Sequence, residues 1–121
     1  MKFTIQGELP DLNTYINAER GNRYAGASLK KKATEKVVLS ILESGCKERF
    51  NNISLAITYY CKNKRKDKDN IAFAKKFILD GLQKAGTIEN DGWKNIDFWN
   101  EGFQIDKENP RIYVHIIGDE L

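Results

Sequence analysis

The chain has 121 residues and a net charge of +3, and 40% of its residues are hydrophobic while 31% are charged. This length predicts a single domain over residues 1–121 with one modest core, and the content of two prolines and nine glycines argues against a disordered or fibrous chain. The charge excess is too small to identify an anionic partner by itself.

The first half of the chain predicts a strand, a loop and a helix. Polar and apolar residues alternate over Lys2–Gly7, which favours a strand. Pro10 interrupts the pattern because proline lacks a backbone donor, and the polar residues 13–27 predict a long loop with at most one helical turn. Ser28 is a candidate cap for a helix ending near Gly45, whose apolar residues recur at helical spacing: Leu29, Ala33, Val37, Ile41 and Leu42.

The second half predicts a strand, a helix and two more strands. The run Ile53–Cys61 is rich in β-branched and aromatic residues, and its alternation places Ile53, Leu55, Ile57 and Tyr59 on one face. A helix is expected from about Asn70 to a stop at Gly86. Its apolar stripe consists of Ile71, Ala74, Ile78, Leu82 and Ala85, with Phe77 beside it. Strands are expected around residues 96–99 and over Arg111–Ile117.

The predicted order is therefore strand, loop, helix, strand, helix, strand, strand. Such a mixture favours an α+β fold of two layers, in which two main helices cover one face of a mixed sheet of about four strands. No segment approaches the ~18 consecutive apolar residues that a membrane span needs, and the first residues do not resemble a signal peptide. We therefore expect a cytoplasmic protein with no membrane partner, in which Cys46 and Cys61 are free thiols.

Several kinds of chemistry lack their residues. The single histidine, His115, lies within a predicted strand, so a histidine-pair metal site is excluded, and two cysteines cannot build a four-ligand zinc site at a recognised spacing. The chain has neither a P-loop nor a G-x-S-x-G nucleophile motif. We expect no small-molecule cofactor.

The chemistry that these residues still allow is that of carboxylates. Asp67 and Asp69 are two residues apart just before the second helix, and in extended backbone such side chains point to the same side. Paired carboxylates suit a hard divalent cation such as Mg²⁺, with Mn²⁺ as a possible substitute. Asp91, in the polar turn after the helix, is the leading candidate for a third carboxylate. Lys75 and Lys76 lie one to two turns into the helix and could reach a scissile phosphate.

Structural interpretations of the same residues stay open. Asp69 or Asn70 could cap the helix, Asp67 could add negative charge near its start, and Asp91 could stabilise a turn. The basic residues could form solvated faces. If the basic residues instead bind nucleic acid, they do so from two regions of the sequence, Arg20–Lys36 and Lys62–Lys68. The candidate DNA contacts are Asn13, Arg20, Arg23, Lys30, Lys31, Lys62, Lys64, Arg65, Lys66, Lys68 and Asn70.

The chain resembles the RusA-type Holliday junction resolvases. The resemblance rests on Asp67-x-Asp69-Asn70, on Lys76-x-x-x-Asp80-x-Leu82, and on Ala85-Gly86 followed by Asp91. The early segment Leu9–Asn13 and the last predicted strand also fit, so the resemblance covers nearly the whole chain. The stretch between Asn70 and Lys76 is about one turn longer than in the best-known members, and Asn90 replaces an acidic residue.

The resemblance implies a small dimeric endonuclease of the phage and prophage type that depends on Mg²⁺. Such an enzyme resolves four-way DNA junctions in recombination and repair by paired symmetric nicks. It implies that Asp67, Asp69 and Asp91 bind the metal ion and that Lys76 or Lys75 assists catalysis. Affinity for DNA should then fall steeply with salt. Three alternatives stay open: a non-catalytic nucleic-acid-binding protein, a nuclease acting on other branched or single-stranded nucleic acids, and a small interaction protein.

Overall fold

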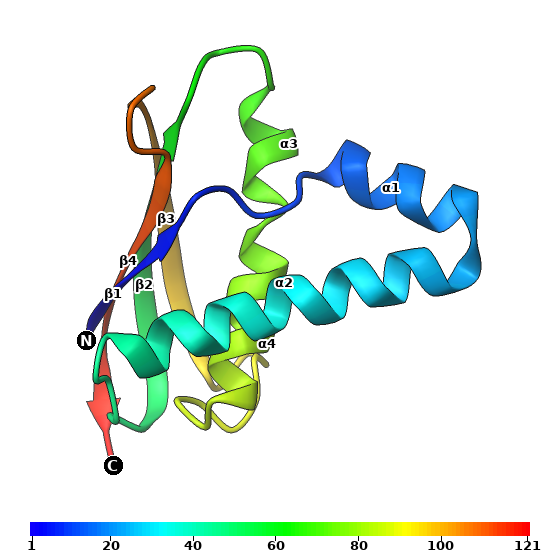
Figure 1. Cartoon of the computed structure of the whole chain (residues 1–121). Helices are drawn as coiled ribbons and strands as arrows, with labels where there is room; N and C mark the ends of the chain where they lie inside the picture. Colours follow the sequence, from blue (N-terminus) through cyan, green and yellow to red (C-terminus); the bar gives the residue numbers. More distant parts are fainter.

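The computed structural model describes residues 1–121 and has an α+β fold, as predicted. A mixed four-stranded sheet forms one layer, and the helices lie together on one of its faces (Figure 1). The strands are β1 (Lys2–Gln6), β2 (Phe50–Cys61), β3 (Ile96–Ile105) and β4 (Arg111–Glu120). The helices are α1 (Leu12–Gly21), α2 (Arg23–Glu43), α3 (Lys68–Ala72) and α4 (Lys75–Lys84). None of these helices combines the length and apolarity needed to cross a membrane.

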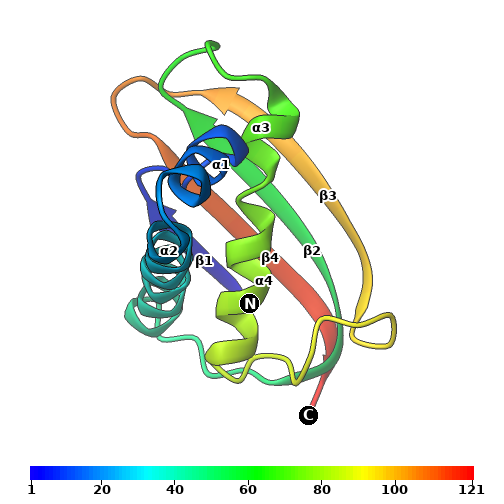
Figure 2. The same ribbon diagram turned by 90° about the vertical axis from the view of Figure 1, so that its right-hand side faces the viewer.

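The sheet has the strand order β1-β4-β2-β3 (Figure 2). β4 pairs antiparallel with both β1 and β2, whereas β3 pairs parallel with β2. Parallel neighbours need a crossover connection, and α3 and α4 supply it. β1 and β3 are therefore the two edges of the sheet, and β3 is twice as long as β1.

The core lies between the sheet and the helices. The predicted inward face of β2 is confirmed, because Ile53, Leu55, Ile57 and Tyr59 are all buried. Val37 and Ile41 of α2, together with Phe77, Ile78 and Leu82 of α4, cover them from the helical layer. Leu42 was expected in the stripe of α2 but is 64% exposed, since α2 turns Thr34 and Ser40 inward instead. Cys46 and Cys61 are free thiols, as expected.

The predicted loop over residues 13–27 is wrong. Asp11 caps α1 by accepting a hydrogen bond from the Thr14 amide at 2.7 Å, and Asn22 caps α2 by accepting one from the Tyr24 amide at 2.8 Å. Ser28 consequently lies inside α2 and does not cap it. α1 has no fully buried residue, so it lacks the apolar stripe that would have identified it. Its contacts with the rest of the fold include that of Tyr15 with Phe73, whose rings lie 5.3 Å apart.

The helix expected from Asn70 is divided. It begins earlier, at Lys68, with Asp67 in the N-cap position, and it is interrupted between α3 and α4. The interruption turns Phe73 toward Tyr15 and Phe77, so that three aromatic rings connect α1 with the crossover. The two final strands are also longer than expected, because β3 pairs with β2 as far as Ile105 and β4 pairs with β2 as far as Glu120.

Candidate functional site

The segment that joins β2 to α3 stands at the carboxyl ends of the parallel strands β2 and β3, at the top of Figure 1. Ligand sites of sheets with parallel strands commonly lie beyond these ends. Lys62, Lys64 and Arg65 are exposed on this segment and make no ion pair. A groove of about 720 Å³ runs beside it, between α3 and the end of β3. Lys68 borders this groove, with its ammonium group 5.6 Å from the centre of the Phe103 ring.

Asp67 and Asp69 present free carboxylates at this end of the molecule. Both are exposed, and neither takes part in an ion pair. Asp67 has extended backbone (φ −70°, ψ 151°) and makes no capping hydrogen bond with its side chain, while Asp69 Oδ1 only accepts from the Asn70 amide at 2.9 Å. The alternative in which Asp69 or Asn70 is the N-cap is therefore wrong. Carboxylate oxygens that pair with no lysine or arginine are available to bind a metal ion.

Asn70 connects the crossover to the beginning of α1. Its Oδ1 accepts a hydrogen bond from the Asn13 amide at 3.0 Å, across 57 residues of sequence. The two asparagines had been predicted as DNA contacts, and the structure brings them together. The bond uses the Asn70 carbonyl oxygen and leaves its NH₂ group free, so Asn70 can both position α1 and donate to a ligand.

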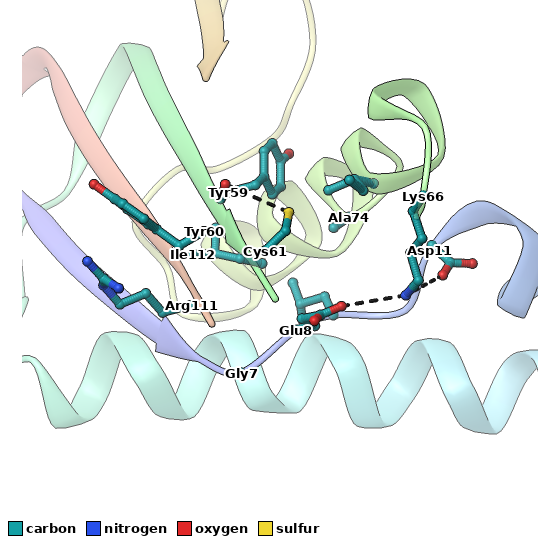
Figure 3. Close-up of a pocket in the computed structure, with 12 residues that line it drawn as sticks. Gly7, Glu8, Asp11, Tyr59, Tyr60, Cys61, Lys66, Ala74, Arg111 and Ile112 are labelled. Atoms are coloured by element: carbon teal, nitrogen blue, oxygen red, sulfur yellow. Dashed lines mark hydrogen bonds and ion pairs between the residues drawn. The ribbon is translucent and has the colours of Figure 1, made fainter. Parts of the chain in front are cut away.

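Lys66 attaches this segment to the beginning of the chain (Figure 3). Its ammonium group lies 2.7 Å from Asp11 and 3.5 Å from Glu8, and thereby ties the β2–α3 connection to the β1–α1 connection. Asp11 is only 5% exposed. Burial raises the pKa of Asp11, but hydrogen bonds from Lys66 and Thr14 outweigh burial and hold that pKa below its ordinary value. Conversely, the hydrogen bond to Asp11 raises the pKa of Lys66. Of the basic residues in Lys62–Lys68, Lys66 is thus the one that forms ion pairs within the chain.

Lys66→Met should lower the free energy of unfolding by about 1 kcal/mol at neutral pH, because the pair is partly solvent-screened. The pair is complete between the ordinary pKa values of 3.8 for Asp11 and 10.5 for Lys66. Since the folded pKa of Asp11 is depressed, its contribution is lost as pH falls through that folded pKa. Urea unfolding of the wild type and of Lys66→Met at pH 7 and pH 3 measures the difference in their free energies of unfolding at each pH. An equal deficit at the two pH values would show that lost packing, and not the charge, was responsible.

The two helix lysines point to different neighbours. Lys75 lies 3.0 Å from Glu101 of β3 and 4.3 Å from the centre of the Trp99 ring. Lys76 lies 3.2 Å from Asp80, which Lys30 of α2 approaches to 3.7 Å. Both lysines therefore have carboxylate partners. Lys75 faces the edge strand of the sheet, and Lys76 faces α2.

Glu101 is not among the predicted site residues, yet it lies at the centre of a small polar cluster. Its carboxylate accepts a hydrogen bond from the hydroxyl of buried Tyr59 at 2.8 Å as well as the ion pair from Lys75. Burial, and then the charge of Glu101, raises the pKa of Tyr59, so this phenol remains protonated and donates. The sequence feature that could have identified Glu101 is its position in β3, two residues after Trp99, which places it beside Ile57 on the helix side of the sheet.

Asp91 is not brought to Asp67 and Asp69. It lies in the segment between α4 and β3, at the opposite end of the crossover. The crossover spans residues 68–84, roughly 25 Å at 1.5 Å per helical residue. The structure contains no group of three or more His, Cys, Asp or Glu side chains that could hold a metal ion. One chain therefore supplies two of the three expected carboxylates at one end and the third at the other.

The remaining candidate DNA contacts lie on a second surface. Arg20 and Arg23 are at the turn of the α1–α2 hairpin, which projects sideways from the sheet in Figure 1. Arg23 is held against Tyr24, with its guanidinium carbon 4.8 Å from the ring centre. Lys31 is exposed, whereas Lys30 approaches Asp80. The two basic regions of the sequence are therefore separate surfaces in the fold.

No protein-family model matches the chain, and no curated protein sequence matches it significantly. The resemblance to junction resolvases therefore stays a prediction that rests on the residues quoted for it.

Proposed function

We propose that the protein is a Mg²⁺-dependent, structure-specific DNA endonuclease that cuts branched DNA such as four-way junctions. One observation carries the proposal. The unpaired carboxylates of Asp67 and Asp69 adjoin the exposed, unpaired Lys62, Lys64 and Arg65 at the carboxyl ends of two parallel strands. Acidic groups bordered by free cations suit a metal ion acting on a polyanion. The resemblance of the D-x-D-N segment to junction resolvases supports the same proposal.

The fit to a metal ion is incomplete within one chain. Asp67 and Asp69 can offer two carboxylates, but Asp91 stands at the other end of α4, and the structure contains no three-ligand group. When bound, a divalent cation would supply an activated water and neutralise charge on the phosphate. The residues of the chain itself have separate tasks: the basic segment holds the DNA backbone, and the Lys66 pair with Asp11 fixes this segment on the fold.

The test is cleavage of a labelled synthetic four-way junction, beside a linear duplex of the same sequence. With Mg²⁺ we expect paired, symmetric nicks near the crossover of the junction, no comparable cleavage of the linear duplex, and loss of the nicks with chelator. Mn²⁺ in place of Mg²⁺ and a single-stranded substrate complete the series. Cleavage of single-stranded nucleic acid in preference to the junction would reassign the substrate while keeping the nuclease.

A second candidate is a non-catalytic protein that binds nucleic acid. The separation of Asp91 from the other two carboxylates favours this candidate. So do the ion pairs that Lys75 and Lys76 form with carboxylates of the chain itself. It predicts tight, salt-sensitive junction binding with no nicks in either metal. That result would replace the nuclease proposal, and a binding affinity that does not respond to salt would exclude both.

A further inference from the structure

We propose that the groove between α3 and the end of β3 binds one unpaired nucleobase of a DNA strand. The base stacks on Phe103, and the phosphates on either side of it lie along the lysines of the rim, close to Asp67. The choice of DNA as the ligand rests on the proposed function. The groove adds what the protein recognises in that DNA, namely a base that has lost its pairing partner.

The groove combines an apolar wall with a basic rim. Three apolar side chains form the wall, those of Ile71, Phe103 and Ile105. The rim carries Lys64 and Lys68, which make no ion pair within the chain. The volume of about 720 Å³ lies within the range of roughly 300–1,000 Å³ that is usual for small-molecule sites. A flat ring attached to a chain of negative charges matches both parts, and a nucleobase on its phosphodiester backbone is such a group.

The core holds the ring of Phe103 in place. Buried Tyr59 stacks on this ring, with the ring centres 5.2 Å apart and an interplanar angle of 20°. The Lys68 ammonium group lies over the same ring, 5.6 Å from its centre. A cation–π contact at an exposed site changes an equilibrium constant by about twofold to fivefold, whereas stacking of a base changes it by about fivefold to 150-fold. A base therefore displaces the ammonium group, which is then free to contact a phosphate.

The groove also has hydrogen-bonding groups without partners. Asn63 Oδ1 accepts a hydrogen bond from the Arg65 amide at 3.0 Å, which leaves the NH₂ group of Asn63 free beside the groove. Because β3 is an edge strand, the backbone groups on its outer side have no partner in the sheet. An unpaired base carries donors and acceptors along its edge, and burying them without partners is costly. The free groups of the groove can supply those partners.

Stacking on Phe103 requires a base whose face is free. In a continuous duplex the neighbouring bases cover both faces of each base, and its edge is paired. Taking a base out of the stack costs least where it is mismatched or already single-stranded. Asp67 also lines the groove, so the phosphate attached to the bound base lies close to the candidate metal-binding carboxylates. Recognition of an unpaired base and the position of the cut are thereby linked.

The test compares affinities for a DNA duplex that contains one unpaired nucleotide and for the same duplex with an abasic site at that position. Binding is measured in chelator, which prevents cleavage. The abasic site should weaken binding by the wild type at least about fivefold. It should leave the affinity of Phe103→Leu nearly unchanged, because leucine offers no ring face, whereas Phe103→Tyr should respond as the wild type does. An equal loss in wild type and Phe103→Leu overturns the proposal. No loss in the wild type overturns it without any variant.

Two further variants separate the wall from the rim. Phe98→Leu is the matched control, because Phe98 is an exposed phenylalanine of the same strand that points to the other face of the sheet. It should respond to the abasic site as the wild type does. Lys64→Gln should weaken binding to both DNAs alike and lower the slope of log affinity against log salt by about 1, since a phosphate contact carries no information about the base. Loss of the abasic effect in Phe98→Leu would contradict the assignment of the base to the groove.

The base groove and the nuclease can fail separately. An abasic effect in a protein that never cuts DNA in Mg²⁺ would support the groove and count against the proposed function alone. Cleavage of a four-way junction without any abasic effect would support the nuclease and overturn the groove. If another protein fills the groove, DNA binding should be indifferent both to the abasic site and to Phe103→Leu, which also overturns the proposal.

Discussion

Asp69→Asn is expected to slow Mg²⁺-dependent cleavage of a four-way junction by about 100-fold or more. A bound metal stabilises charge in the transition state by several kcal/mol, and each 1.4 kcal/mol changes the rate about tenfold. The asparagine oxygen can still accept the hydrogen bond from the Asn70 amide, so folding should be unaffected. Junction binding should be unchanged or slightly tighter, because a negative charge beside the basic segment has been removed.

The matched control is Asp119→Asn. Asp119 is also exposed, and it lies near the end of β4, away from α3. The same change of charge there should leave cleavage at the wild-type rate. Single-turnover cleavage and binding in chelator, measured for all three proteins, separate chemistry from affinity. If Asp69→Asn cuts as fast as the wild type in Mg²⁺, Asp69 is not part of the catalytic site, and the proposed function loses its main support.

The elements with strong periodicity could be predicted from the sequence. The alternation in β2 and the apolar stripe of α4 each place several side chains on one face, and burial follows the predicted faces. α1 could not be found in this way, because it buries no residue completely and is held mainly by Tyr15 against two aromatic rings. Its cap, Asp11, is of a residue type that serves turns equally well. The contacts that hold α1 are tertiary, and local pattern does not contain them.

The candidate site was predictable only in part. Spacing along the chain places Asp67 and Asp69 at the start of the crossover, and the structure keeps both there. The expectation that both lie on extended backbone and point to the same side is wrong for Asp69, which lies in the first turn of α3. The position of Asp91 depends on a property that spacing does not encode, namely that β3 runs parallel to β2. A parallel strand begins at the end of the sheet where its neighbour began, so the crossover carries Asp91 away from Asp67. The engagement of Lys66 with Asp11 is also tertiary, since 55 residues separate the two.

Gly81→Ala should destabilise the protein, although alanine favours a helix more than glycine does. Gly81 lies where α4 crosses α2, and a Cβ atom there would overlap Cγ1 of Val37 and come within 2.7 Å of its Cβ. Both helices are packed on the sheet, so neither can move freely. Overpacking of this kind costs about 1–3 kcal/mol, and the gain in helix propensity returns only about 1 kcal/mol. The difference leaves a loss of up to about 2 kcal/mol, so the melting temperature should fall by up to roughly 8 °C.

Gly21→Ala is the matched control, since Gly21 is also helical and a Cβ atom there would meet nothing within 4 Å. It should be neutral or slightly stabilising. Val37→Ala removes Cγ1, the atom that the new methyl group overlaps most, and alone it should destabilise by opening a cavity. Combined with Gly81→Ala it should cost less than the sum of the two single changes, because each relieves the defect of the other. Thermal unfolding of the four variants gives this coupling directly. Additive losses would mean that α2 and α4 do not meet at Gly81, and that the layer supporting the crossover, and with it Asp67 and Asp69, is packed differently.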